Sequence, residues 1–253
     1  MIAVVTGASS GLGAATARRL AREPDARLVL VARREARLRQ LADEIARIDG
    51  ASATVLAVDL TSDDAPARVR ELLEREHGGR LDLLVNNAGA AWGSTFAEGG
   101  WENVRRTMEL NFNAQVRLTE ALLPLLRASA PSAIVNVSST AGRVARAGGG
   151  AYSASKFAFA GWSDALALEE RSHGVHVGLV LPGFVSTEGF PQRQLVGHPL
   201  ARFVVGKPET VAEAVVEAGL SRKPERYTPR PYGIAAALRI VAPRLVRRAL
   251  GWR

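Results

Sequence analysis

The chain has 253 residues, 47% of them hydrophobic, so it is long enough for one large or two small domains with a substantial buried core. It contains no cysteine, which excludes disulfide bonds, thiolate metal sites and cysteine nucleophiles and fits a reducing compartment such as the cytoplasm. Its four histidines show no metal-ligand spacing, so no metal is expected. No leader pattern and no run of about 18 apolar residues occurs, so we expect neither a signal peptide nor a membrane span.

The net charge of +8 lies at the C-terminal end of the chain. Residues 221–253 hold nine basic side chains and one acidic one, whereas the basic and acidic residues of the remainder cancel. Because the body is neutral, we expect no nucleic-acid partner.

The tail, residues 231–253, has an amphipathic helical pattern. Arginines lie opposite a face of apolar residues that recur at spacings of three and four, namely Ile234, Leu238, Val241, Leu245, Ala249 and Trp252. Pro243 is expected to split the pattern into two helices or to begin the second one. Two interpretations stay open: the tail lies on an anionic membrane surface, or it packs on the body or a neighbouring subunit.

The N-terminal stretch has the order strand, glycine turn, helix. The apolar run Ile2 to Thr6 leads into T-G-A-S-S-G-L-G, which ends at Gly13 and opens a helical pattern that stops before Pro24. This order places backbone N–H groups and the positive end of a helix where a phosphate can bind. The spacing is G-x-x-x-G-x-G rather than G-x-G-x-x-G, and in this context it predicts a dinucleotide site.

Two arginines, Arg33 and Arg34, follow the second predicted strand, Arg27 to Ala32. An NAD site usually has an acidic residue at this place for the ribose 2′-hydroxyl, whereas an arginine accommodates the 2′-phosphate of NADP. No acid follows the strand, so we predict NADP(H) in preference to NAD(H). The alternative is that both arginines only begin an exposed helix over residues 35–48.

Apolar runs and helical patterns alternate along the rest of the chain. Further strands are indicated at residues 53–58, 81–85, 133–137 and 175–181, with a short seventh strand at 226–228. Helices are predicted at residues 35–48, 64–77, 100–129, 152–173 and 208–220. Continuous apolar strands favour a parallel sheet covered on both faces. The expected fold is a single-domain α/β, Rossmann-type doubly wound parallel sheet of about seven strands over residues 1–230.

Tyr152 and Lys156 are four residues apart in a predicted helix, so their side chains share one face. A nearby cation favours phenolate and lowers the tyrosine pKa, which makes Tyr152 a candidate general acid or base. Ser139 ends the preceding strand, where a hydroxyl can point into the crevice in which open α/β sheets bind ligands. The alternative is an ordinary Tyr and Lys pair on a solvated helix.

Together these features resemble the short-chain dehydrogenase/reductase family over nearly the whole chain to about residue 230. The family motifs correspond to Thr6–Gly13 (T-G-x-x-x-G-x-G), Asn86–Gly89 (N-N-A-G), Asn111, Ser139, Tyr152–Lys156 (Y-x-x-x-K) and Pro182–Thr187 (P-G-x-x-x-T). Each motif is common alone, but six in family order are specific.

The resemblance implies four catalytic residues, Asn111, Ser139, Tyr152 and Lys156. Tyr152 would pass a proton to or from the substrate oxygen, and Ser139 would hydrogen-bond that oxygen. Lys156 would hold the nicotinamide ribose and lower the tyrosine pKa, while Asn111 would support a proton path through water. The cofactor would supply the hydride.

The expected cofactor site combines the glycine turn and the two arginines with residues that the resemblance implies. Asp59 and Leu60 resemble the family's adenine-binding pair, and residues 185–187 resemble its nicotinamide clamp. The expected cofactor-binding residues are Gly7, Ser9, Ser10, Gly11, Leu12, Gly13, Arg33, Arg34, Asp59, Leu60, Asn87, Ala88, Gly89, Tyr152, Lys156, Pro182, Gly183, Val185 and Thr187.

The family resemblance implies a lid after the sixth strand, at about residues 184–206, and this segment is rich in apolar side chains. With Trp92 and Phe96, it suggests a bulky lipophilic carbonyl or secondary alcohol as substrate. The alternative is that these side chains only pack the lid onto the body.

The predicted function is therefore an NADP-dependent oxidoreductase that interconverts a carbonyl and a secondary alcohol. Reduction of a 3-oxoacyl group on a carrier protein is the nearest alternative, and a nucleotide-sensing protein without turnover is an alternative of another class. The family resemblance also implies a homodimer or homotetramer formed through the two long helices.

Overall fold

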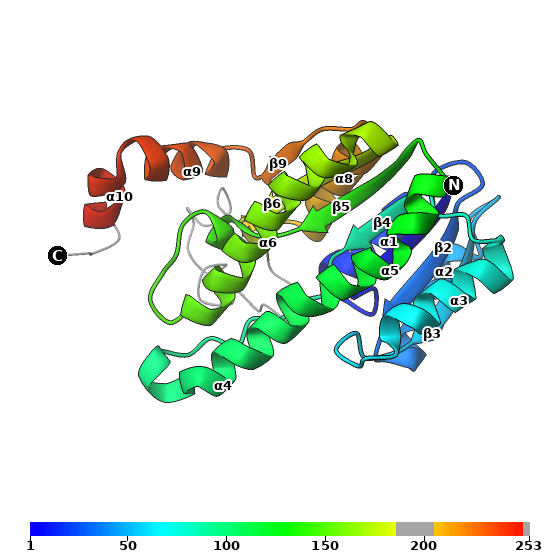
Figure 1. Ribbon diagram of the computed structural model, residues 1–253, viewed down its shortest axis with the longest axis horizontal. Helices are drawn as coiled ribbons and strands as arrows, with labels where there is room; N and C mark the ends of the chain where they lie inside the picture. Colours follow the sequence, from blue (N-terminus) through cyan, green and yellow to red (C-terminus); the bar gives the residue numbers. More distant parts are fainter. Residues whose placement is uncertain (186–204, 250–253) are drawn as a thin grey trace.

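The computed structural model describes residues 1–185 and 205–249 as a seven-stranded parallel sheet with helices on both faces (Figure 1). The strands stand in the order β3-β2-β1-β4-β5-β6-β9. Their bounds are β1 Ile2–Thr6, β2 Arg27–Ala32, β3 Ser52–Ala57, β4 Leu83–Asn86, β5 Ser132–Val137, β6 Val175–Pro182 and β9 Glu225–Thr228. The predicted fold class is confirmed.

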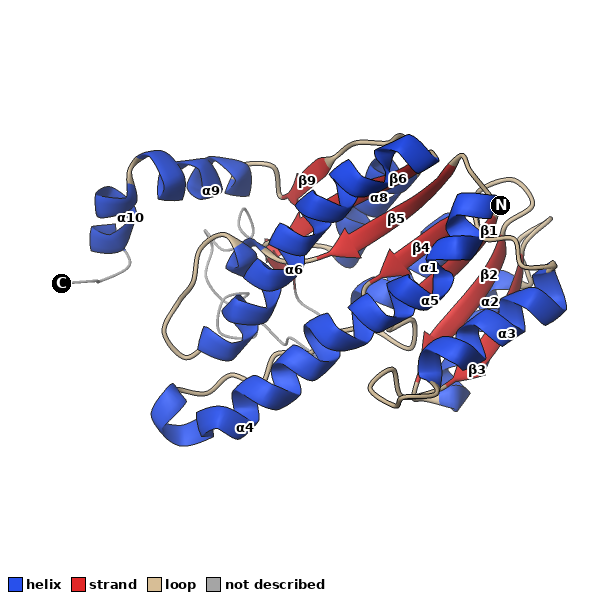
Figure 2. Ribbon diagram, in the orientation of Figure 1, coloured by secondary structure: helices blue, strands red, loops and turns tan. Residues whose placement is uncertain are grey.

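The helices form a layer on each side of the sheet (Figure 2). One layer packs α1 (Gly11–Leu20), α2 (Glu35–Ile45) and α8 (Pro208–Gly219) against one face. The other packs α3 (Ala65–His77), α5 (Ala114–Ala128) and α6 (Gly150–Glu169) against the opposite face. Successive residues of β1 point alternately into the two cores, as the pleat requires, which is why this central strand is buried along its whole length.

The predicted helix over residues 100–129 is three elements rather than one. Helix α4 (Phe96–Met108) is joined to α5 by a π-helical turn, Glu109–Asn113. Hydrophobic periodicity does not reveal one extra residue in a turn, so the prediction missed it. Pro124 lies inside α5 near its C-terminal end.

The segment after β6 contains a short element that the sequence did not indicate. Strand β7 (Phe184–Val185) pairs with β8 (Val205–Gly206) in a separate two-stranded sheet. Most of the predicted lid, with Thr187, lies outside the described residues.

The tail forms two helices, α9 (Tyr232–Val241) and α10 (Pro243–Ala249), so Pro243 begins the second one. Both extend away from the sheet (Figure 1). Within the described ranges, no helix is long and apolar enough to cross a membrane.

Strand order places the functional loops together. The order reverses between β1 and β4, which lie side by side, with Val5 opposite Val85. In open α/β sheets ligands bind at such a switch point, outside the carboxyl ends of the strands. The glycine turn after β1 and the N-N-A-G loop after β4 therefore border one crevice.

Candidate active site

Thr6 connects the glycine turn to the N-N-A-G loop. Its hydroxyl donates to the carbonyl of Val85 (3.1 Å) and accepts from the backbone N–H groups of Asn87 (2.9 Å) and Ala88 (3.0 Å). The Asn87 amide donates in turn to the Thr6 carbonyl (2.8 Å). Gly7 has φ +67°, and a Cβ there would lie 2.9 Å from the Cα of Ala88. The two loops thus meet backbone to backbone, which requires glycine.

A cavity of about 290 Å³ begins at this junction. It is lined at one end by Gly7, Ser10, Gly11 and Asn87 and at the other by Tyr152 and Lys156. The N-terminus of α1 borders it, so backbone N–H groups and the positive helix end are available to a phosphate. A Cβ on Gly89 would stand 3.1 Å from Asn111 Oδ1 and 3.6 Å from Lys156 Nζ, so the missing side chain keeps the cavity open. These residues fit a dinucleotide.

Arg34 reaches the glycine turn from the start of α2. Its guanidinium donates to Ser10 Oγ (2.6 Å) and to Ser9 Oγ (3.3 Å). Arg33 is 70% exposed and lies 3.7 Å from the carboxylate of Asp59. The two predicted arginines therefore stand on either side of the end of β2, with at least one directed at the phosphate-binding turn.

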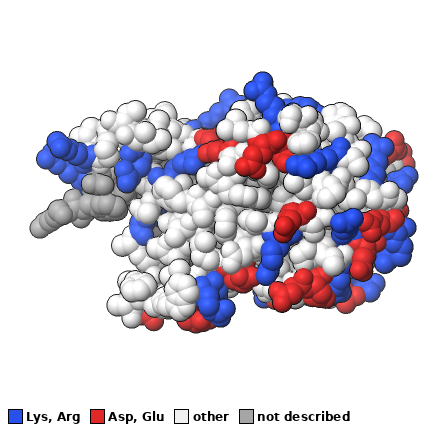
Figure 3. Space-filling view, in the orientation of Figure 1, with Lys and Arg blue, Asp and Glu red and all other residues white. Residues whose placement is uncertain are grey.

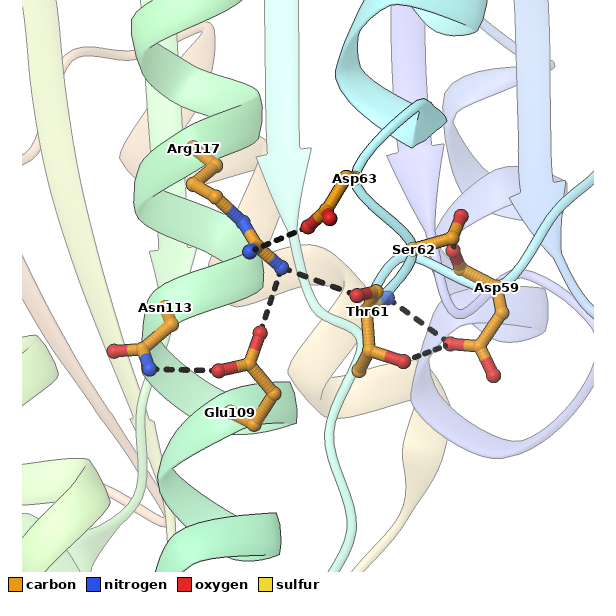
Figure 4. A network of polar contacts seen from close by, with 7 residues as sticks. All are labelled: Asp59, Thr61, Ser62, Asp63, Glu109, Asn113 and Arg117. Carbon is orange, nitrogen blue, oxygen red and sulfur yellow. Dashed lines mark hydrogen bonds and ion pairs between the residues drawn. The ribbon is translucent and has the colours of Figure 1, made fainter.

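A polar network joins the loop after β3 to the π-helical turn (Figure 4). The backbone N–H and hydroxyl of Thr61 donate to Asp59 (3.0 and 2.8 Å), while Arg117 from α5 contacts Asp63 (3.3 Å) and Glu109 (2.6 Å). Burial acts to raise the pKa of Asp59, but the Thr61 hydrogen bonds and the Arg33 charge outweigh it, so its pKa is lowered. Leu60, in contrast, is buried in the core.

Lys156 holds its ammonium inside the protein, since the residue is only 4% exposed. Nζ donates to the carbonyl of Val137, the last residue of β5, at 3.0 Å. It also lies 5.9 Å from the ring centroid of Tyr152. Burial lowers the pKa of Lys156 from 10.5 to about 8, so the amine is still protonated at neutral pH.

Tyr152 and Ser139 meet through a hydrogen bond between their side chains. Ser139 is nearly buried, and its hydroxyl also donates to the carbonyl of Pro182 (3.4 Å) and accepts from the N–H of Ala141 (3.1 Å). Neighbouring Ser138 instead donates to the backbone carbonyl of Lys156 (2.9 Å). Of the two adjacent serines, Ser139 therefore faces the tyrosine.

The expectation that Lys156 lowers the pKa of Tyr152 is wrong for this arrangement. Burial raises the pKa of Tyr152 above 10, and the hydrogen bond with Ser139 offsets only part of that effect. The ammonium is turned toward the carbonyl of Val137 instead of the phenol oxygen. Tyr152 is therefore a neutral phenol at neutral pH, the form that can donate a proton.

Asn111 lies in the π-helical turn and is fully buried. Its side chain exchanges two hydrogen bonds with the backbone of Ala90, both 2.9 Å, and its amide donates to Ser155 Oγ (3.1 Å). The Ser155 hydroxyl donates to the carbonyl of Tyr152 (2.7 Å). Asn111 is therefore joined to the catalytic-looking helix through Ser155. Sequence reasoning missed Ser155, although it lies three residues after Tyr152 on the same helical face.

A second cavity, about 230 Å³, opens on the other side of Tyr152. The structure places five of the expected cofactor residues on its wall, together with Ser139: Leu12, Tyr152, Pro182, Gly183 and Val185. Its remaining lining is mostly apolar and comprises Ser138, Thr140, Ala141, Val144, Arg146, Phe184, Tyr232, Ala235 and Ala236.

The tail contributes to this second cavity, which the sequence did not indicate. Tyr232, Ala235 and Ala236 of α9 line it, and a Cβ on Gly183 would lie 2.4 Å from the ring of Tyr232. One face of α9 therefore packs on the body, as one of the two interpretations of the tail expected.

Comparison with known proteins identifies the family of the chain. A family model described as short chain dehydrogenase matches residues 1–194. A ketoacyl reductase, HetN, from Nostoc sp. is 33% identical, with 85% of this chain and 74% of that protein aligned. A 3-ketodihydrosphingosine reductase from Bacteroides thetaiotaomicron is 32% identical over 95% of this chain and 83% of its own length.

The fold has a similar solved structure, a short-chain dehydrogenase from Streptomyces avermitilis. It superposes with a TM-score of 0.82 at 28% identity and covers 98% of this chain and 95% of its own. A doubly wound sheet with a crevice at its switch point is typical of nucleotide-binding α/β proteins. The chain belongs to the short-chain dehydrogenase family, whose members are oxidoreductases that use a nicotinamide cofactor.

The buried ammonium leads to a stability prediction. In the unfolded chain the amine holds its proton up to pH 10.5, but in the fold only up to about 8, so the ammonium opposes folding below pH 8. We expect Lys156→Met to raise the free energy of unfolding by about 1 to 3 kcal/mol at neutral pH, with the gain disappearing as the pH rises toward 10.5.

Urea unfolding at neutral and alkaline pH measures this effect. The exposed Lys223 supplies a matched control, since Lys223→Met removes an amine without relieving burial. A Lys156→Met protein less stable than the wild type at neutral pH would contradict the prediction.

Proposed function

We propose that the protein is an NADP-dependent oxidoreductase that interconverts a carbonyl and a secondary alcohol, acting as a reductase. The observation that supports this most directly is that Tyr152 lines both cavities. A group at that position can contact a dinucleotide on one side and an apolar substrate on the other. Ser139 lines the apolar cavity and Lys156 the dinucleotide cavity, so each side has a polar partner for the phenol.

In the proposed reduction, the glycine turn, the N-N-A-G loop and Lys156 would hold a nicotinamide cofactor, and the hydride for the carbonyl carbon would come from it. Ser139 donates a hydrogen bond to the carbonyl oxygen and orients it toward Tyr152. The phenol of Tyr152 transfers its proton to that oxygen, which completes the alcohol and leaves a phenolate. Lys156, which lines the dinucleotide cavity, would hold the nicotinamide ribose there. Asn111 and Ser155 position the helix turn that holds Tyr152.

The preference for NADP(H) rests on Arg34 and Arg33. Arg34 already lies at the serines of the phosphate-binding turn, where a 2′-phosphate would compete with the hydroxyls for its guanidinium. No acidic residue stands at the end of β2 to bind a ribose 2′-hydroxyl. Asp59 is already engaged with Thr61 and Arg33.

The lipophilic substrate is proposed from the apolar lining of the second cavity. The two reductases compared above are named for ketones, a ketoacyl group and 3-ketodihydrosphingosine. A 3-oxoacyl group on a carrier protein stays the alternative, and activity on an acyl thioester over a free ketone would favour it. A nucleotide sensor without turnover has no chemical need for the Ser139, Tyr152 and Lys156 arrangement.

We also propose a homodimer or homotetramer formed through α4, α5 and α6. Large apolar side chains stand exposed on these helices, with Trp101 69% and Leu168 77% exposed. A second copy of the chain would cover them.

We further propose that this cytoplasmic enzyme meets an anionic membrane surface through the tail. The outer side of the tail helices exposes large apolar residues, Ile234, Leu238, Ile240, Val241 and Leu245. Figure 3 shows blue, basic side chains on the projecting tail, and residues 231–249 contain no acidic residue. On an anionic membrane, the apolar residues would insert among the lipid chains and the arginines would contact the negatively charged headgroups.

The catalytic assignment predicts the behaviour of Tyr152→Phe. The variant keeps the aromatic ring but lacks the hydroxyl that donates the proton. Turnover of ketones should therefore fall at least about a thousandfold while NADPH still binds. Steady-state rates and a fluorescence titration with NADPH measure the two effects. Turnover near the wild-type rate would show that another group donates the proton.

The cofactor assignment predicts that NADPH binds about tenfold or more tightly than NADH. Arg34→Gln should remove most of this difference by weakening NADPH alone. The control is Arg22→Gln, which removes an exposed charge beyond the C-terminal end of α1, at the opposite end of that helix from the glycine turn. Equal binding of both cofactors to the wild type would refute the assignment.

The membrane proposal predicts that the protein sediments with vesicles of anionic lipid and not with neutral ones. The double variant Ile240→Asp, Val241→Asp changes two exposed residues outside the cavity wall and should weaken vesicle binding about tenfold or more. Leu220→Asp, at the end of α8 and outside both the tail and the proposed subunit interface, is the control. Equal, negligible sedimentation of all proteins would overturn the proposal.

A further inference from the structure

The apolar cavity beside Tyr152 contains one cationic side chain, Arg146, among its described lining residues. The guanidinium carbon lies 4.4 Å from the ring centroid of Phe184, which also lines the cavity. Arg146 is exposed, so its guanidinium is accessible both to solvent and to a ligand in the cavity that it lines. An apolar ligand that covered this charge would take it out of water without a partner, whereas an anionic group would compensate it.

Carboxylates compensate the charges of two other arginines, Arg143 and Arg226, but none compensates the charge of Arg146 among the residues that the structure describes. Arg143, three residues earlier, lies 3.0 Å from Glu225, and Arg226 bonds to Glu217. Among the residues that the structure describes, no carboxylate lies within ion-pairing distance of Arg146, and its close partner is the aromatic ring. Arginine binds carboxylate and phosphate groups through paired N–H donors, so this guanidinium is available to an anion.

The loop that holds Arg146 is anchored at both ends. It begins after the short 3-10 helix Thr140–Gly142, which follows Ser139, and it ends at Gly149, immediately before α6. The carbonyl of Gly148 accepts from the N–H of Ser94 (3.0 Å), and the carbonyl of Arg146 accepts from the N–H of Gly149 (3.2 Å). Arg146 therefore belongs to the same connection as Ser139 and Tyr152, and its position relative to them is set by the fold.

The positive charge of Arg146 also acts on the pKa of Tyr232, which lines the same cavity. Tyr232 of α9 has a pKa raised by burial, while a hydrogen bond from the Phe184 backbone N–H and the positive charge of Arg146 oppose that rise. The cavity wall thus combines apolar surface, a phenol and an uncompensated cation. A neutral hydrocarbon in the cavity would offer this cation no partner, whereas an anionic group would pair with it.

We propose that Arg146 binds an anionic group, a carboxylate or a phosphate, on a substrate whose apolar body fills the second cavity. The substrate class would then be lipophilic ketones or alcohols that also bear an acid, and Arg146 would select them over neutral analogues. The proposal rests on the proposed function, because it assigns the second cavity to the substrate.

Binding of matched ligands tests the proposal without requiring turnover. Decanoate, decyl phosphate and decanol share one alkyl chain, and each is titrated calorimetrically into the wild type with and without NADPH. We expect the wild type to bind at least one anion about tenfold or more tightly than decanol. Which anion binds more tightly distinguishes a carboxylate site from a phosphate site.

Variants of Arg146 complete the test. Arg146→Gln should bind the anions no more tightly than decanol, and Arg146→Lys should keep part of the preference. Arg22→Gln, remote from the cavity, should behave as the wild type. A wild type that binds both anions no more tightly than decanol, or an Arg146→Gln protein that keeps the preference, would overturn the proposal.

Turnover separates this inference from the proposed function. Keto acids of increasing chain length are compared with their methyl esters as substrates for the wild type and Arg146→Gln. Loss of the charge should raise KM for the acids about tenfold or more, with little change for the esters. Absence of turnover with every ketone, combined with tight anion binding at Arg146, would refute the reductase function and leave the anion site standing.

Discussion

The buried ammonium of Lys156 is the constraint on which the rest of the site depends. A cation in the interior must be held by a fixed acceptor, and the carbonyl at the end of β5 provides it. The backbone of Lys156 is held in turn by the hydroxyl of Ser138 and by Gly142, where a Cβ would lie 2.6 Å from the Lys156 carbonyl. The strand end, the loop after it and α6 are thereby locked together, and Tyr152 stands one helical turn before the charge.

The parallel sheet makes this arrangement useful. Since the carboxyl ends of β1, β4 and β5 meet at one edge, the glycine turn, the N-N-A-G loop and Ser139 face the same crevice. Tyr152 divides it into a polar dinucleotide cavity and an apolar cavity closed partly by α9. The tail is therefore part of the wall of the apolar cavity, and its other side stays exposed.

Much of this was predictable from the sequence because it depends on local pattern. Apolar runs of five or six residues gave the strands, and the spacing of Tyr152, Lys156 and Ser139 placed three groups that do converge. Patterns did not reveal how burial competes with charge, so the predicted pKa of Tyr152 had the wrong direction. The π-helical turn at Asn111 and the contact of Tyr232 with Gly183 depend on tertiary packing, which periodicity does not encode.

The ionisation of Lys156 can be measured directly, because the chain has only three lysines, Lys156, Lys207 and Lys223. Protein labelled with ¹³C at the lysine ε-carbon should give three NMR signals, with Lys156 identified by its loss in Lys156→Met and the two exposed lysines serving as references. The account predicts that Lys156 titrates at about 8. Titration at or above the ordinary 10.5 would contradict the claim that the fold buries this charge beside Tyr152.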